Sequence, residues 1–106
     1  MLKAYQKWVR DNTDYPYKHN TTEEALIHFS LGLNGEAGEV AEVVKKRIYA
    51  LDPLCNDSSE ALIGEIGDVM WYLTALCCTV GLELEDVLKH NMYKLEEKYG
   101  LSNKSS

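Results

Sequence analysis

The feature that most constrains this chain is a short motif of glycines and carboxylates that occurs twice. The chain reads GEAGEV at residues 35–40 and GEIGDV at residues 64–69, each within a stretch of helical periodicity. Glycine in a helix interior costs about 1 kcal/mol relative to alanine, and neighbouring carboxylates repel one another. Two copies of so unfavourable a combination indicate that both segments serve one site.

Helical periodicity extends over most of the chain, and no strand-type alternation of useful length occurs. Capping-box spacing at two helix starts and glycines at two helix ends set the predicted boundaries. The four predicted helices run from Leu2 to about Asp11, from Thr21 to about Ile48, from Asp57 to Gly81, and from Glu83 to Tyr99. The sequence therefore predicts an all-α chain, with a single domain at residues 1–100 and a polar tail at residues 101–106.

Helical geometry places the acids of the two motifs at matched angles. Each residue advances about 100° around a helix. Glu36 and Glu65 lie about 60° from the centre of the apolar stripe of their own helix, and Glu39 and Asp68 lie about 120° from it in the same sense. The two stripes consist of Leu26, Phe29, Leu33, Ala37, Val40 and Val44, and of Leu62, Ile66, Val69, Leu73, Leu76 and Val80. Antiparallel packing of these helices would place both acid pairs beside one cleft.

Four carboxylates beside one cleft need a cation, because partial burial makes each charge more costly. Their oxygen atoms are ligands that suit Mg²⁺ or Mn²⁺, and the glycines would let the helices and a hydrated ion or phosphate approach closely. A lone E-x-x-E pair usually marks a solvated face, but two matched copies favour a metal site. A di-iron site is disfavoured, because none of the histidines has the Glu-x-x-His spacing.

The charge and cysteine content narrow the class of partner and the compartment. A formal net charge of −6 and a pI near 5.0 argue against binding of polymeric nucleic acid. No secretory signal or membrane span is expected, since the longest nearly apolar run, Val69–Val80, is about half the length of a span. The three cysteines, an odd number without metal-ligand spacing, predict free thiols in a reducing cytoplasm.

The two motifs and the residues around them resemble the MazG-like nucleoside triphosphate pyrophosphohydrolases of the all-α NTP pyrophosphatase superfamily. The resemblance rests on E-x-x-E at residues 36–39 and E-x-x-D at residues 65–68, and extends to N-x-x-K-L at residues 91–95 and KYG at residues 98–100. It covers about Tyr5 to Gly100. It implies a four- to five-helix bundle that assembles as a homodimer or homotetramer.

The resemblance also implies a reaction. A nucleoside triphosphate or deoxynucleoside triphosphate would be cleaved between the α and β phosphates, which yields a monophosphate and pyrophosphate. Glu36, Glu39, Glu65 and Asp68 would hold Mg²⁺ and form the catalytic set. One of them, or Glu42, would accept the proton of the attacking water.

The fourth helix offers groups for the phosphates. Asn91, Lys94 and Lys98, which we call the basic strip, lie at i, i+3 and i+7 on one helical face. Lysine receives phosphate oxygens as a point charge, and the family pattern agrees for Asn91 and Lys94, whereas relatives often have arginine at Lys98. Lys46 follows Glu39 by seven residues on the same side of its helix and could also approach a phosphate. A solvated role is favoured over phosphate binding for this lysine.

Base recognition and assembly are predicted from the third helix. Tyr72 and Trp71 follow Asp68 closely and are candidates for stacking on a nucleobase, with Trp8 or His28 as further lining. Core packing is the more common role for each of these rings. Apolar residues occupy nearly the whole circumference of this helix, which predicts that a second subunit covers part of it.

Two alternatives to general nucleotide hydrolysis remain at this point. One is a different activity within the superfamily, such as that of the dimeric dUTPases or the phosphoribosyl-ATP pyrophosphohydrolases. The other is an oligomeric module that binds nucleotides without hydrolysing them, which the presence of all four acids disfavours.

Overall fold

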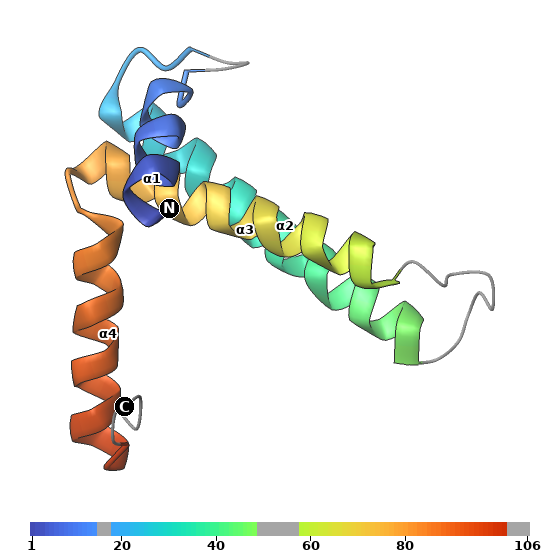
Figure 1. The fold of residues 1–106 in the computed structure, drawn as a ribbon. Helices are drawn as coiled ribbons and strands as arrows, with labels where there is room; N and C mark the ends of the chain where they lie inside the picture. Colours follow the sequence, from blue (N-terminus) through green and yellow to red (C-terminus); the bar gives the residue numbers. More distant parts are fainter. Residues whose placement is uncertain (15–17, 49–57, 102–106) are drawn as a thin grey trace.

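The structure is a computed structural model that describes residues 1–14, 18–48 and 58–101. Its described residues form four helices: α1 (Leu2–Asp11), α2 (Thr22–Ile48), α3 (Ser58–Val80) and α4 (Leu84–Tyr99). Helices α2 and α3 lie side by side as a long antiparallel hairpin, α1 crosses one end of it, and α4 projects away from that same end (Figure 1). The all-α prediction is confirmed. The predicted linker, which contains Cys55, and the polar tail beyond Leu101 lie outside the described residues.

Side-chain caps define the start of α2. The Thr21 Oγ1 accepts a hydrogen bond from the backbone N–H of Glu24 at 3.1 Å, as a capping box requires. The Glu24 carboxylate accepts in return from the N–H of Asn20 at 2.9 Å, one residue earlier than the usual partner. The first bond satisfies an N–H of the first helical turn, which has no intrahelical acceptor, and the second ties the residue before the N-cap to the helix.

The end of α3 and the start of α4 form a tight corner. Gly81 has a φ of 74°, in the left-handed region that favours glycine, and the N–H of Leu82 donates to the carbonyl of Cys77 at 2.8 Å. Gln6, which is only 3% exposed, holds this corner from α1. Its side-chain amide donates to the carbonyl of Leu82 and accepts from the N–H of Leu84, each at 2.8 Å. The direction in which α4 leaves the hairpin is therefore set by α1.

The core lies where α1 crosses the hairpin. Four buried apolar side chains form its centre, and partly buried side chains pack around them. The centre consists of Val9, Ala25, Phe29 and Ala75, and the surrounding side chains are Tyr5, Trp71, Tyr72, Leu76 and Cys78. The core thus occupies one end of the hairpin, and the rest of α2 and α3 extends beyond it.

The face of α3 that meets α2 differs from the predicted stripe. Ala75 is fully buried, whereas Ile66 and Leu73 of the stripe are exposed. The physical reason is the fit between Tyr72 and Gly32, because the Tyr72 ring occupies the space that a Cβ at Gly32 would need. Gly32 leaves room for this ring, so the aromatic side of α3 packs against α2 at this level.

Helix α3 is apolar over a longer stretch than the sequence run at residues 69–80 suggested. Among the described residues, Ser59–Val80 is long and apolar enough by length and composition to cross a membrane, and 17% of its apolar window is buried within the chain. A core helix of a soluble protein meets the same criterion. Within this stretch, Glu65 and Asp68 lie beside an acid of α2.

Candidate active site

Three of the four predicted acids meet in the middle of the hairpin. Glu36 from α2 and Glu65 and Asp68 from α3 each offer a carboxylate oxygen, and these oxygens all lie within 4.8 Å of one another. We call these residues the carboxylate trio. Glu36 and Glu65 are half-buried and Asp68 is exposed, which follows the order of their predicted angles from the apolar stripes. Antiparallel pairing of two helices therefore joins acids that are 29 residues or more apart in sequence.

The electrostatics of the trio disfavour three charged carboxylates without a counter-ion. Burial raises the pKa of Glu36, and a hydrogen bond to Glu65 together with the charges of Asp68, Glu65 and Glu39 raises it further. A divalent cation would remove this repulsion, and the all-oxygen donor set fits a hard cation such as Mg²⁺ or Mn²⁺.

Glu39, the fourth predicted acid, stands at the edge of the trio. It is exposed, and its charge is one of those that raise the pKa of Glu36. It does not belong to the group of three carboxylates whose oxygens converge. Glu39 therefore lies close enough to act on the site electrostatically without sharing its centre.

The glycines of the two motifs do not mediate close packing of α2 on α3 within this chain. These glycines are Gly35, Gly38, Gly64 and Gly67. A Cβ added at any of the four would meet no protein atom within 4 Å. The close contact that sequence analysis attributed to them is made instead by Gly32, against Tyr72. The motif glycines thus leave open space along the hairpin, next to the acids.

The basic strip does not reach the trio within one chain. Asn91, Lys94 and Lys98 are all exposed on α4, which packs chiefly on α1 and extends away from the hairpin (Figure 1). The Lys98 ammonium lies 5.2 Å from the centre of its neighbour's ring, Tyr99. Lys46 is exposed in the last turn of α2, ten residues beyond Glu36, which is about 15 Å along the helix.

The aromatic candidates lie in the packing between the helices. Trp71 and Tyr72 contact each other edge to face at 5.3 Å, and Trp71 also meets Phe29 edge to face at 5.8 Å. His28 lies 6.2 Å from Tyr72. Trp8 is mostly exposed on α1, with its ring 6.0 Å from that of Tyr5. For Trp71 and Tyr72 the arrangement is that of core packing.

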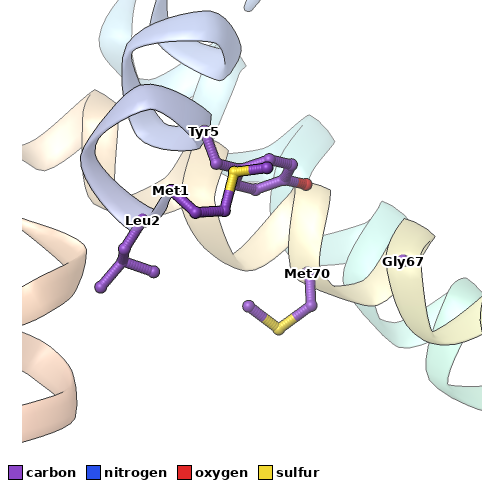
Figure 2. A pocket seen from close by; sticks show the side chains of 5 residues that line it. All are labelled: Met1, Leu2, Tyr5, Gly67 and Met70. Carbon is purple, nitrogen blue, oxygen red and sulfur yellow. The ribbon is translucent and has the colours of Figure 1, made fainter.

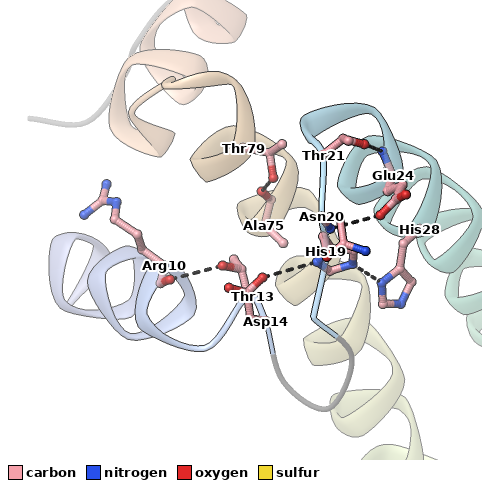
Figure 3. A network of polar contacts seen from close by, with 10 residues as sticks. All are labelled: Arg10, Thr13, Asp14, His19, Asn20, Thr21, Glu24, His28, Ala75 and Thr79. Atoms are coloured by element: carbon pink, nitrogen blue, oxygen red, sulfur yellow. Dashed lines mark hydrogen bonds and ion pairs between the residues drawn. The ribbon is translucent and has the colours of Figure 1, made fainter.

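A polar network ties the segment before α2 to the start of that helix (Figure 3). The His19 Nε2 and His28 Nδ1 atoms share a hydrogen bond at 2.7 Å, and the other ring nitrogen of His19 lies 3.4 Å from the Asp14 carboxylate. The His19 ring also meets Phe29 edge to face at 5.1 Å. This network anchors the chain after α1 beside the aromatic end of the hairpin.

A cavity that sequence analysis missed lies between α1 and α3. Its volume is about 500 Å³, and its lining consists of Met1, Leu2, Tyr5, Gly67 and Met70 (Figure 2). We call it the apolar cavity. Burial raises the pKa of Tyr5, and the charge of Asp68 raises it further. The cavity therefore lies on the same side of α3 as part of the carboxylate trio. No sequence signal joins Met1 to Gly67, because only the crossing of α1 over α3 brings them together.

The fold and site together define an all-α protein in which acids from two antiparallel helices share one centre. A family model described as the MazG nucleotide pyrophosphohydrolase domain matches residues 21–100. The chain belongs to this family, and the resemblance inferred from the motifs is confirmed. The Gene 37 protein of Mycobacterium phage L5 is 34% identical over 99 residues, which cover 92% of this chain and 87% of that protein. No solved structure matches the chain.

Proposed function

We propose that this protein hydrolyses nucleoside triphosphates or deoxynucleoside triphosphates between the α and β phosphates, with Mg²⁺ or Mn²⁺ as cofactor. The products are a nucleoside monophosphate and pyrophosphate, and the role is control of a nucleotide pool. The observation that carries the proposal is the carboxylate trio, whose oxygens lie within 4.8 Å of one another in a chain of the MazG nucleotide pyrophosphohydrolase family.

The acidic residues of the hairpin have different roles in this proposal. Glu36, Glu65 and Asp68 hold the cation, and Glu39 adds negative charge at its edge. When bound, the ion neutralises the triphosphate and lowers the pKa of water. Glu42, exposed on α2 six residues beyond Glu36, or a carboxylate of the set accepts the proton of the attacking water.

We also propose that the active unit is a homodimer or homotetramer. The basic strip lies away from the trio in its own chain, so a neighbouring copy supplies it to the triphosphate. Exposed apolar side chains on α3 and α4 support this assembly, since such residues favour burial in an interface. They include Ile63, Ile66, Leu73 and Val80 on α3, and Leu88, Met92, Tyr93 and Tyr99 on α4. A cytoplasmic location, suggested by the free thiols of Cys77 and Cys78, stays a prediction.

The test is pyrophosphate release from a panel of NTPs and dNTPs, with Mg²⁺ and with EDTA, and with identification of the nucleotide product. Wild type is compared with Asp68→Asn and Glu65→Gln, and Lys18→Ala, on an exposed residue outside the site, is the control. We expect cation-dependent release of monophosphate and pyrophosphate that both acid variants lose.

Other outcomes separate the alternatives. Release of orthophosphate would place the cut at another bond and overturn the proposal. Turnover restricted to dUTP, or to phosphoribosyl-ATP supplied as an additional substrate, would assign the narrower superfamily activities. Cation-dependent nucleotide binding without any turnover would identify a binding module.

A further inference from the structure

The apolar cavity has the size and lining of a small-molecule site. Ligand cavities commonly measure about 300–1,000 Å³ and have mostly apolar walls with few polar groups, and this one measures about 500 Å³. Among its five lining residues, the only polar side-chain atom is the Tyr5 hydroxyl oxygen. Figure 2 shows the Tyr5 ring beside the Met1 side chain, with Met70 of α3 facing the same space. A flat and weakly polar group suits these walls, because thioethers and aromatic rings both contact π systems favourably.

The cavity adjoins the carboxylate trio. Gly67 lines the cavity and is followed directly by Asp68, whose oxygen belongs to the trio. The charge of Asp68 acts on Tyr5 across the space between α3 and α1. With a divalent cation held by the trio, a molecule with one anionic end and one flat apolar end would find a matching surface for each end along α3.

We propose that the apolar cavity receives the nucleobase of a nucleotide whose phosphates lie at the carboxylate trio, and that Gly67 determines the size of base it admits. This inference rests on the proposed function. The base packs against the Tyr5 ring and the Met70 thioether, with the exposed Met1 side chain at the rim of the cavity. Among the lining residues, the Tyr5 hydroxyl is the only side-chain group that can hydrogen-bond to the base. Selection among nucleotides should therefore depend more on the contact area of the base than on its hydrogen-bonding pattern. Purine nucleotides should therefore be favoured over pyrimidine nucleotides.

Gly67 permits a test that leaves the fold in place. A Cβ at this position meets no protein atom within 4 Å, and leucine has a higher helix propensity than glycine. The variant Gly67→Leu thus narrows the cavity without a clash in the protein. Ala61→Leu is the matched control, because it adds the same side chain at an exposed position of α3 that does not line the cavity.

The measurements are KM and kcat for purine and pyrimidine triphosphates, nucleotide affinity by calorimetry, Mn²⁺ affinity by electron paramagnetic resonance, and thermal unfolding. Base–aromatic contacts are worth about 1–3 kcal/mol, so Gly67→Leu should raise KM for purine triphosphates about fivefold or more. Mn²⁺ affinity should match that of Ala61→Leu, and the unfolding temperature of Gly67→Leu should be no lower than that of Ala61→Leu. A second comparison uses Met70→Ala, which enlarges the cavity and should weaken nucleotide binding, and Leu31→Ala, at an exposed position of α2 outside the cavity, which should not.

The outcomes for the two proposals are distinct. If wild type releases pyrophosphate and Gly67→Leu and Met70→Ala bind nucleotides as wild type does, the base lies elsewhere and only this inference is overturned. A loss of Mn²⁺ affinity in Gly67→Leu equal to its loss of nucleotide affinity would also overturn it, because the effect would then come from the carboxylates. If wild type hydrolyses no nucleotide of the panel, the proposed function fails and this inference fails with it.

Discussion

The Gln6 side chain accepts a hydrogen bond from the backbone N–H of Leu84 at 2.8 Å, across 78 residues of sequence. Glu83, the N-cap of α4, makes no side-chain capping bond, so Gln6 performs this task from another helix. The same amide donates to the carbonyl of Leu82. One buried side chain thus joins α1 to the corner from which α4 departs.

Replacement of Gln6 by leucine should destabilise the fold. The N–H of Leu84 would remain buried without an acceptor, which costs about 1–3 kcal/mol. For a domain of about 100 residues, each 1 kcal/mol lowers the unfolding temperature by about 4–8 °C. Thermal unfolding followed by circular dichroism checks this, with Lys3→Ala on the exposed side of α1 as control. Equal unfolding temperatures for the two variants would show that the amide does not hold the corner.

The stability of the metal-free protein should depend on pH through Glu36. Its pKa is raised in the folded chain above the ordinary 4.5, so the folded state binds this proton more tightly than the unfolded state does. The contribution to stability is full below about pH 4.5 and is lost as the pH rises through the raised pKa. Relative to wild type, Glu36→Gln should therefore gain stability as the pH rises above about 4.5. Urea unfolding at several pH values with EDTA measures this difference, and a difference constant with pH would contradict it.

Cation affinity should fall in an order set by the geometry. Glu36→Gln and Asp68→Asn each remove an oxygen of the trio, whereas Glu39→Gln removes a charge at its edge. We expect the first two to weaken Mn²⁺ binding about tenfold or more, and Glu39→Gln to weaken it by less. Mn²⁺ titration by electron paramagnetic resonance ranks the three. A loss in Glu39→Gln as large as in Asp68→Asn would place Glu39 among the direct ligands.

Two glycines of α2 should respond in opposite directions to alanine. A Cβ at Gly32 overlaps the ring of Tyr72, while a Cβ at Gly35 meets no protein atom within 4 Å. Gly32→Ala should lower the free energy of unfolding by about 1–3 kcal/mol, as overpacked cores do. Gly35→Ala should raise it by up to about 1 kcal/mol through helix propensity. Denaturant unfolding of both variants is the measurement, and stabilisation by Gly32→Ala would contradict the observed packing.

Mixing of two inactive variants should restore activity if a neighbouring copy completes the site. Lys94→Ala removes the phosphate contact, and Glu36→Gln removes a cation ligand. In randomly mixed dimers half of the dimers hold one chain of each kind, and each of these has one complete site. We expect about a quarter of wild-type pyrophosphate release after co-refolding. Activity no higher than that of the separate variants would place Lys94 in the same site as the Glu36 of its own chain, or outside the site.

The sequence was informative where local rules decide the structure. Caps such as Thr21 and Gly100 predicted helix ends because they act through their nearest neighbours on the backbone. The angles of Glu36 and Glu65 predicted their meeting, because helical periodicity and antiparallel pairing are enough to place them. The family then followed from the spacing of these acids.

Contacts between distant segments could not be predicted from the sequence. A glutamine in an amphipathic helix gives no sign that it caps another helix, as Gln6 does for α4. Five glycines in α2 and α3 looked alike, yet only Gly32 meets a facing ring. The apolar cavity joins Met1 to Met70, and periodicity within either helix says nothing of how the two cross.

The seating of Tyr72 on Gly32 has a consequence for the evolution of the hairpin. A larger residue at position 32 requires a smaller one at position 72, because both claim the same volume between the backbones. Either substitution alone would pass through a strained or a hollow intermediate. Descendants of this chain should therefore keep the pair or change both members together, even though 40 residues separate them in the gene product.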